Sequence, residues 1–213
     1  MTLLQEPELQ RFVFDRVDWA FYQDVCRRLD GRHVFITYYK GKLEVVTTSY
    51  LHERISSLLG SMIRVLAEET DTPLASAGRT TLREQSADEG VEADVSFYTV
   101  NAHRMNDKRD IDLTVDPPPD LAVEVEVTRR LGERRLIYRD MGVPELWRYA
   151  ADGLTFLVRR DADYERVDRS PTFPQLSPQE LFGFVASGLA SDETPWIKDF
   201  RRRVQQVLRQ SST

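Results

Sequence analysis

The chain of 213 residues is 41% hydrophobic and 30% charged, a composition typical of a globular protein long enough to bury one sizeable core. Its single cysteine, Cys26, excludes an internal disulfide, and no apolar run approaches the roughly 18 residues that a membrane span needs. The net charge of −6 excludes a basic footprint spread over the whole chain, so any nucleic-acid contact must come from a local cluster. With no apolar stretch typical of a secretory signal at the N-terminus, we expect a cytoplasmic protein with no membrane segment.

The first half of the chain predicts a hairpin followed by a long helix. Residues 33–39 are β-branched and aromatic, which predicts a strand that Lys40-Gly41-Lys42 turns back into a second strand at 43–47. Apolar residues at spacings of three and four then predict a helix that starts at Thr48 or Ser49 and ends at 70–73. Two further strands are expected at 79–84 and 91–98.

The second half alternates strands and helices. The run DLAVEVEV at 120–127 is the most strand-like segment, and a helix at about 130–141 ends at Gly142. The remaining elements are strands at 146–149, 154–160 and 164–168, a helix capped at Ser177, and a final amphipathic helix from near Thr194.

This order predicts a single α/β domain over residues 1–213 with a mixed central sheet flanked by helices and extended by β-hairpins. The core is expected at 33–160. The N-terminal region 1–32 and the C-terminal segment 177–210 are expected to be helical decoration.

Two glutamates occupy one face of the strand at 120–127. Alternation places Ala122, Glu124 and Glu126 together, opposite a face of valines. An apolar strand of this kind is usually covered on both faces, where uncompensated carboxylates are costly. The two glutamates therefore indicate a functional site, and the alternatives are a solvated sheet face or ion pairs with nearby arginines.

The strand at 91–98 repeats this pattern, with Glu92, Asp94 and Ser96 expected on one face. If the two strands are neighbours, Asp94 and Glu124 lie roughly 5 Å apart across the ladder. Two carboxylates that close repel each other unless a cation lies between them. Mg²⁺, or Mn²⁺ in its place, suits such a site because it takes oxygen ligands and keeps several waters.

The segment RRLGERRLIYR at 129–139 holds five arginines in eleven positions. The cluster can contact nucleic-acid phosphates, and it can equally be the solvated face of a helix. A second cluster, Arg201-Arg202-Arg203, favours the solvated alternative. The candidate nucleic-acid-binding residues are Arg129, Arg130, Arg135 and Arg139.

Three segments, EADV, PDLAVEVEVT and IYRDMGVPELWRY, together resemble the Uma-two family of restriction-endonuclease-like proteins in the PD-(D/E)XK nuclease superfamily. The resemblance runs from about residue 41 to residue 184, and GVPELWRY is its most specific part. It implies a restriction-endonuclease-like core in which two acids and a basic residue surround Mg²⁺, with DNA as the substrate.

Carried over by position, the resemblance makes Asp94 the acid of the "PD" half-motif, where Ala93 replaces the proline. It makes Glu124 the second acid, and the backbone carbonyl of Val125 the third metal ligand. Glu126 occupies the position of the superfamily lysine. The resemblance assigns the missing cation to Arg134, which can hold a phosphate but cannot act as a base because it stays protonated.

Two upstream residues also match the family pattern, Glu44 on the hairpin and His52 at the start of the long helix. His52 lies on the core-facing stripe of that helix, so a satisfied core histidine is the alternative to a catalytic one.

Three functions remain open from the sequence. The first is a Mg²⁺-dependent endonuclease that hydrolyses DNA phosphodiester bonds. The second is a catalytically decayed nuclease scaffold that acts as a nucleic-acid-binding or regulatory protein, an alternative that Glu126 and the acidic chain support. The third is a structural or regulatory protein whose carboxylates bind Ca²⁺ or pair with arginines. The amphipathic C-terminal helix also allows a homodimer.

Overall fold

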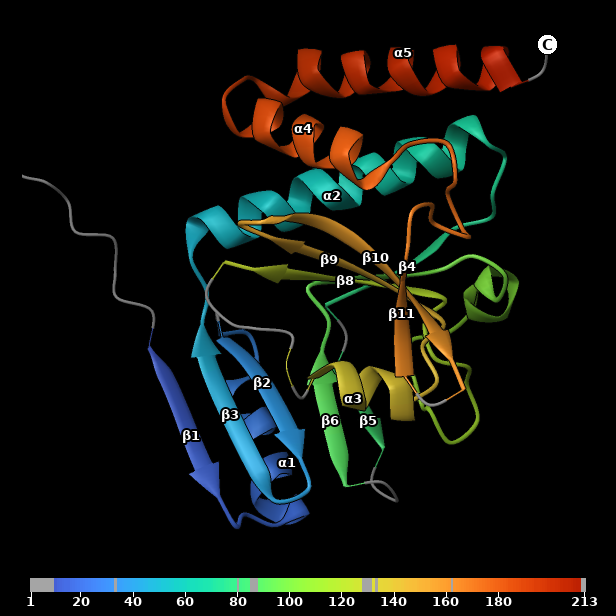
Figure 1. Ribbon diagram of the computed structural model, residues 1–213. Coiled ribbons are helices and arrows are strands. Elements are labelled where there is room, and N and C mark those ends of the chain that lie inside the picture. Colours follow the sequence, from blue (N-terminus) through green and yellow to red (C-terminus); the bar gives the residue numbers. More distant parts are fainter. Residues whose placement is uncertain are drawn as a thin grey trace, which may run out of the picture.

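The computed structural model describes residues 10–32, 34–79, 81–84, 88–127, 132, 134–161 and 163–211. The described strands form two sheets, and Figure 1 shows helices α2, α4 and α5 stacked on the larger one. The strands are β1 Arg11–Asp15, β2 Val34–Tyr39, β3 Lys42–Thr47, β4 Ala75–Gly78, β5 Thr81–Glu84, β6 Glu89–Glu92, β7 Val95–Tyr98, β8 Leu121–Glu126, β9 Glu145–Ala150, β10 Gly153–Arg160 and β11 Asp163–Val167. The helices are α1 Trp19–Leu29, α2 Tyr50–Glu69, the 3-10 helix η2 Ala102–Met105, α3 Arg134–Asp140, α4 Pro178–Leu189 and α5 Glu193–Ser211.

The larger sheet has the order β11-β10-β9-β8-β7-β4, and the smaller one β1-β3-β2-β6-β5. The larger sheet is mixed, because β8 and β9 run parallel while its other pairs are antiparallel. α3 lies in the connection between β8 and β9, as a parallel pair requires a crossover. The predicted α/β class with a mixed sheet is confirmed, and the structure divides the strands between two sheets.

The expected single strand at 91–98 is wrong. The chain leaves the smaller sheet after Glu92, at the end of β6, and enters the larger sheet at Val95, at the start of β7. Period-two alternation continues through the break, which is why the sequence shows no sign of it. Ala93 and Asp94, the residues between the strands, are both buried, so this crossing lies in the interior between the two sheets.

The N-terminal region also differs from its prediction. Residues 11–15 form β1, an edge strand paired with β3, and only 19–29 form a helix. α1 covers one face of the smaller sheet and buries a cluster around Tyr22, Cys26 and Tyr38. β-branched and aromatic residues in RFVFD suit an edge strand better than a helix.

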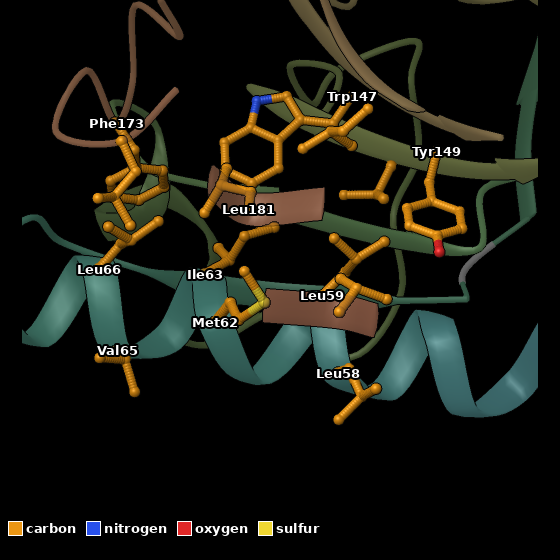
Figure 2. Close-up of a cluster of buried hydrophobic side chains, with 14 of the residues drawn as sticks. Leu58, Leu59, Met62, Ile63, Val65, Leu66, Trp147, Tyr149, Phe173 and Leu181 are labelled. Atoms are coloured by element: carbon orange, nitrogen blue, oxygen red, sulfur yellow. The ribbon is translucent and has the colours of Figure 1, made fainter. Parts of the chain in front are cut away.

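The main core lies between α2 and the larger sheet (Figure 2). The apolar stripe of α2 includes Leu59, Met62 and Ile63, which are fully buried, and Figure 2 shows them facing Trp147 and Tyr149 of β9. The cap of this helix is Ser49, whose hydroxyl accepts the His52 backbone N–H at 3.1 Å. The cap fixes the first turn of α2, which carries His52.

The C-terminal helix uses its apolar face within the chain. Trp196, Phe200 and Val204 of α5 are buried in the main core, and α5 packs on α2 and α4. Arg201 adds ion pairs to Glu68 and Glu69 of α2. Among the described residues, no helix combines the length and apolarity needed to cross a membrane.

A close contact in the smaller sheet predicts a stability effect. Gly90 of β6 lies opposite Tyr38, and a Cβ atom at this position would overlap the hydroxyl of Tyr22. We expect Gly90→Ala to lower the free energy of unfolding by about 1–3 kcal/mol, because overpacking forces Tyr22 out of its stack on Tyr38. Urea denaturation followed by circular dichroism measures the change.

Gly183 in the middle of α4 is the matched control, because a Cβ there meets nothing within 4 Å. We expect Gly183→Ala to be neutral or stabilising by up to roughly 1 kcal/mol, since alanine is the better helix former. A Gly90→Ala protein as stable as the wild type would show that Tyr22 is not tightly packed on β6.

Candidate active site

Asp94 and Glu124 lie at the same end of the β7–β8 ladder, where the two sheets meet. The β7–β8 ladder pairs Val95 with Val123, so Asp94 lies opposite Glu124 one residue beyond it. Each of the two acidic residues is only 2% exposed. The Asp94 carboxylate accepts the backbone N–H of Val125 at 2.6 Å, which ties the chain crossing directly to β8.

Arg134 neutralises Glu124 through a two-point ion pair. Its Nε donates to Oε2 of Glu124 at 3.1 Å and its Nη2 donates to Oε1 at 2.6 Å. The hydroxyl of Tyr138, one turn along α3, also donates to Oε1. All three residues are buried, so the ion pair is shielded from water and from salt.

The same guanidinium reaches the smaller sheet. Nη1 donates to the hydroxyl of Thr37 on β2 at 2.5 Å, and Nη2 donates to the Glu92 carbonyl on β6 at 2.7 Å. Arg134 therefore joins α3, the larger sheet and the smaller sheet at one point. A planar group with five donors is suited to this, and a lysine could not reproduce it.

The surroundings of Arg134 and Tyr138 keep both side chains protonated, so both remain hydrogen-bond donors. Burial lowers the pKa of Arg134, but the attraction of the Glu124 carboxylate outweighs it and the pKa ends above its ordinary value. Burial, reinforced by Glu124, raises the pKa of Tyr138 well above its ordinary value. Tyr138 therefore stays a hydroxyl donor throughout the physiological range.

His52 lies on the other side of Asp94. Its Nε2 is 3.2 Å from Oδ2 of Asp94, although the alignment is too poor for a hydrogen bond. The ring is 1% exposed and packs edge-on against Phe35, with centroids 5.1 Å apart. His52 is therefore a core residue, but neither of its ring nitrogens has a hydrogen-bond partner among the described residues, and its catalytic role stays a prediction.

Glu126 and Glu44 lie near this centre with partners of their own. Glu126 follows on the same face of β8 and forms an ion pair with Arg148 of β9 at 2.5 Å. Glu44 lies opposite Thr37 in the β2–β3 ladder and forms an ion pair with Arg11 at 2.5 Å.

The predicted basic cluster is only partly described. Arg135 pairs with Asp163 at 3.1 Å, and Arg139 pairs with Asp140 at 2.6 Å. Arg129 and Arg130 fall outside the described residues. The second arginine cluster forms ion pairs at least partly exposed to solvent: Arg201 of α5 with Glu68 and Glu69 of α2, Arg202 with Asp199 of α5, and Arg203 with Glu180 of α4.

The carboxylates of this centre limit which metal ions it could bind. Over the described ranges, no group of three or more His, Cys, Asp and Glu side chains converges as a metal site. A structural zinc centre, which needs about four such ligands, does not fit these residues. Mg²⁺ uses one or two carboxylates and fills its remaining positions with water and phosphate oxygens. Asp94 and Glu124 supply the two buried carboxylates that this narrower requirement asks for.

Two residues of the cluster were missed from the sequence, Tyr138 and Thr37. Tyr138 follows Arg134 by four positions, so helical spacing could have placed both on one face of α3. Thr37 is 97 positions from Arg134 and sits in an ordinary β-branched strand, so no local pattern marks it.

Comparison with known proteins gives a family and a fold. A family described as "Uma2: Putative restriction endonuclease" matches residues 19–190. A solved structure from Anabaena variabilis ATCC 29413, titled as a putative nuclease belonging to DUF820, is similar with a TM-score of 0.53 and 17% sequence identity. The match covers 70% of this chain and 90% of the Anabaena chain. No curated protein matches the chain.

The Arg134–Glu124 pair predicts strong energetic coupling. Arg134→Met should lower the free energy of unfolding by about 3–5 kcal/mol, because it leaves Glu124 buried without its cation. The double variant Arg134→Met/Glu124→Gln should cost less than the sum of the two single variants, with a coupling energy of about 1–3 kcal/mol. Urea denaturation of the four proteins completes the cycle.

The exposed pair Arg135–Asp163 gives the control cycle, with side chains 39% and 43% exposed. Its coupling energy should stay below about 1 kcal/mol. Additive costs for Arg134 and Glu124 would mean that their contact does not stabilise the fold.

Proposed function

The chain belongs to the Uma2 family of restriction-endonuclease-like proteins, and from this we propose that it is a metal-dependent nuclease whose reaction centre is the Asp94–Glu124 pair. The observation that carries the proposal is the burial of two carboxylates near a fixed arginine: Glu124 lies on β8, and Asp94 lies in the crossing that leads into β7. Burying carboxylates costs free energy, and clusters of buried ionisable groups are typical of functional sites.

Asp94, Glu124 and the carbonyl of Val125 are the groups that would hold Mg²⁺, with Mn²⁺ as its substitute. The bound ion would supply an activated water and neutralise charge on the scissile phosphate. The chain's own contribution is to hold the two carboxylates in place: the Val125 N–H orients Asp94, and Arg134 with Tyr138 orients Glu124.

The hydrogen bonds of Arg134 favour a positioning role. Nε, Nη1 and Nη2 all donate to protein oxygens, and the side chain is 4% exposed. We therefore assign it to fixing Glu124 and balancing its charge, in place of the direct phosphate contact that the sequence predicts. His52, against Asp94 in the same interior, is assigned the same kind of role.

DNA is the proposed substrate, on the ground of the family description alone. Arg135 and Arg139 on α3 are the described candidates for contacts to its phosphates, and both side chains are partly exposed. Each already has an acidic partner on the surface, so we expect their contribution to DNA affinity to be modest and dependent on salt.

A decayed scaffold remains the second candidate, and one observation favours it. Glu126 stands where the superfamily has lysine, and it is paired with Arg148. A chain that keeps the fold and the acids but lacks a mobile cation could bind nucleic acid without cutting it.

Single-turnover nicking of supercoiled plasmid separates the two candidates. In Mg²⁺ or Mn²⁺ we expect wild-type nicking that Asp94→Asn and Glu124→Gln each reduce by about 10²–10³-fold, as for other losses of transition-state charge stabilisation. Arg134→Lys should retain more activity than Arg134→Ala, because it preserves the positive charge beside Glu124.

The control is Arg139→Ala, for which we expect a small loss that is largest at low salt and shrinks as the salt concentration rises. Circular dichroism melts show which variants are folded, so that a silent but unfolded protein is not counted. No wild-type nicking in either metal over a range of DNA substrates would overturn the nuclease proposal and favour the decayed scaffold.

A further inference from the structure

Among the described strands, the outer strand of the smaller sheet at one edge is β1, which is unusual for an edge strand. β1 ends the order β1-β3-β2-β6-β5, and Figure 1 shows it at the outside of the molecule. All five of its residues are exposed, including Phe12 at 49% and Phe14 at 43%. Edge strands normally carry protection against pairing with other chains, such as charges, bulges or short length.

The edges of the larger sheet have this protection. β4 contains a register shift between Ser76 and Gly78, and β11 has an exposed Glu165-Arg166 pair in its centre. β1 instead places two phenylalanines on one face, where Phe14 lies 6.2 Å from Phe21 of α1. The exposed aromatic surface therefore belongs to β1 and α1 together.

We propose that β1 pairs antiparallel with β1 of a second copy of this chain, about a two-fold axis at Val13. The sequence of the strand, Arg-Phe-Val-Phe-Asp, is complementary to itself when reversed. Pairing centred on Val13 sets Arg11 opposite Asp15 of the second copy, at both ends of the ladder, and Phe12 opposite Phe14. The two sheets then continue into one another across the axis, as a closed isologous dimer requires.

The backbone of β1 supports this register. The Gln10 carbonyl points inward and accepts the Thr47 N–H at 3.0 Å. Because ladder hydrogen bonds alternate along an antiparallel strand, the groups that point outward belong to Arg11, Val13 and Asp15. These are the residues that a pairing centred on Val13 uses for hydrogen bonds. Phe12 and Phe14 then fall at non-hydrogen-bonded positions, where cross-strand side chains lie closest.

The charged residues of β1 also support the register centred on Val13. Alternation places Arg11, Val13 and Asp15 on the face opposite the phenylalanines. Arg11 also pairs with Glu44 within its own chain, and its side chain is still 57% exposed, so it can meet a second carboxylate. Asp15 has no ion pair within the described part of the chain. The C-terminal helix is not needed for the dimer, since its apolar face packs on α2 and α4.

Charge-reversal variants of Arg11 and Asp15, made in the 213-residue chain and studied by analytical ultracentrifugation, test the register. Arg11→Asp places acids at both ends of the pairing and Asp15→Arg places bases there, so each variant alone should dimerise at least about tenfold more weakly than the wild type. An equimolar mixture of the two should dimerise again, because every acid of one variant then meets a base of the other. A different interface would not show this rescue.

Val13→Pro is a second variant, and the melting temperature of each protein shows that it is folded. Since the Val13 N–H points outward, proline leaves the β1–β3 ladder intact but blocks pairing with a second copy. Arg166→Asp on β11 is the matched control and should dimerise as the wild type does. A wild type that stays monomeric at high micromolar concentration, or a dimer that neither the charge reversals nor Val13→Pro weakens, would overturn the proposal.

Discussion

The buried ion pair between Arg134 and Glu124 is the interaction on which this fold depends. Taking two charges out of water costs several kcal/mol per ion, and only good geometry with further hydrogen bonds recovers it. Arg134 provides this geometry through two hydrogen bonds to Glu124 and one each to Thr37 and the Glu92 carbonyl. Because these partners lie on both sheets, the same contacts that neutralise the acid also hold the sheets together.

The crossing between the sheets brings the second acid to the same place. Asp94 stands where the chain passes from β6 to β7, and its carboxylate accepts the Val125 N–H of β8. Thus β8 contributes Glu124, the crossing contributes Asp94, and the packing of α2 on β8 adds His52 beside Asp94. Under the proposed function, the elements that stabilise the fold are also those that orient the metal ligands, so stability and activity should fail together when Arg134 is removed.

Local sequence patterns predicted much of this arrangement. Alternation along 120–127 placed Glu124 and Glu126 on one face, and the register of β7 and β8 brings Asp94 and Glu124 to the same end of the ladder, one residue beyond the Val95–Val123 pair. The break after Glu92 could not be predicted, because a strand that changes sheets keeps its alternation. The contacts of Arg134 with Thr37 and of Glu126 with Arg148 depend on which strands lie together, and this information is in the tertiary fold.

The central claim is that Asp94 and Glu124 form a metal site beside a fixed arginine. Anomalous diffraction from a crystal soaked in Mn²⁺ tests it directly. The account predicts a single strong peak within coordination distance, about 2.1–2.3 Å, of carboxylate oxygens from both Asp94 and Glu124, with Arg134 still bonded to Glu124. No peak at these carboxylates under saturating Mn²⁺, or a peak bound only at the surface, would contradict the account.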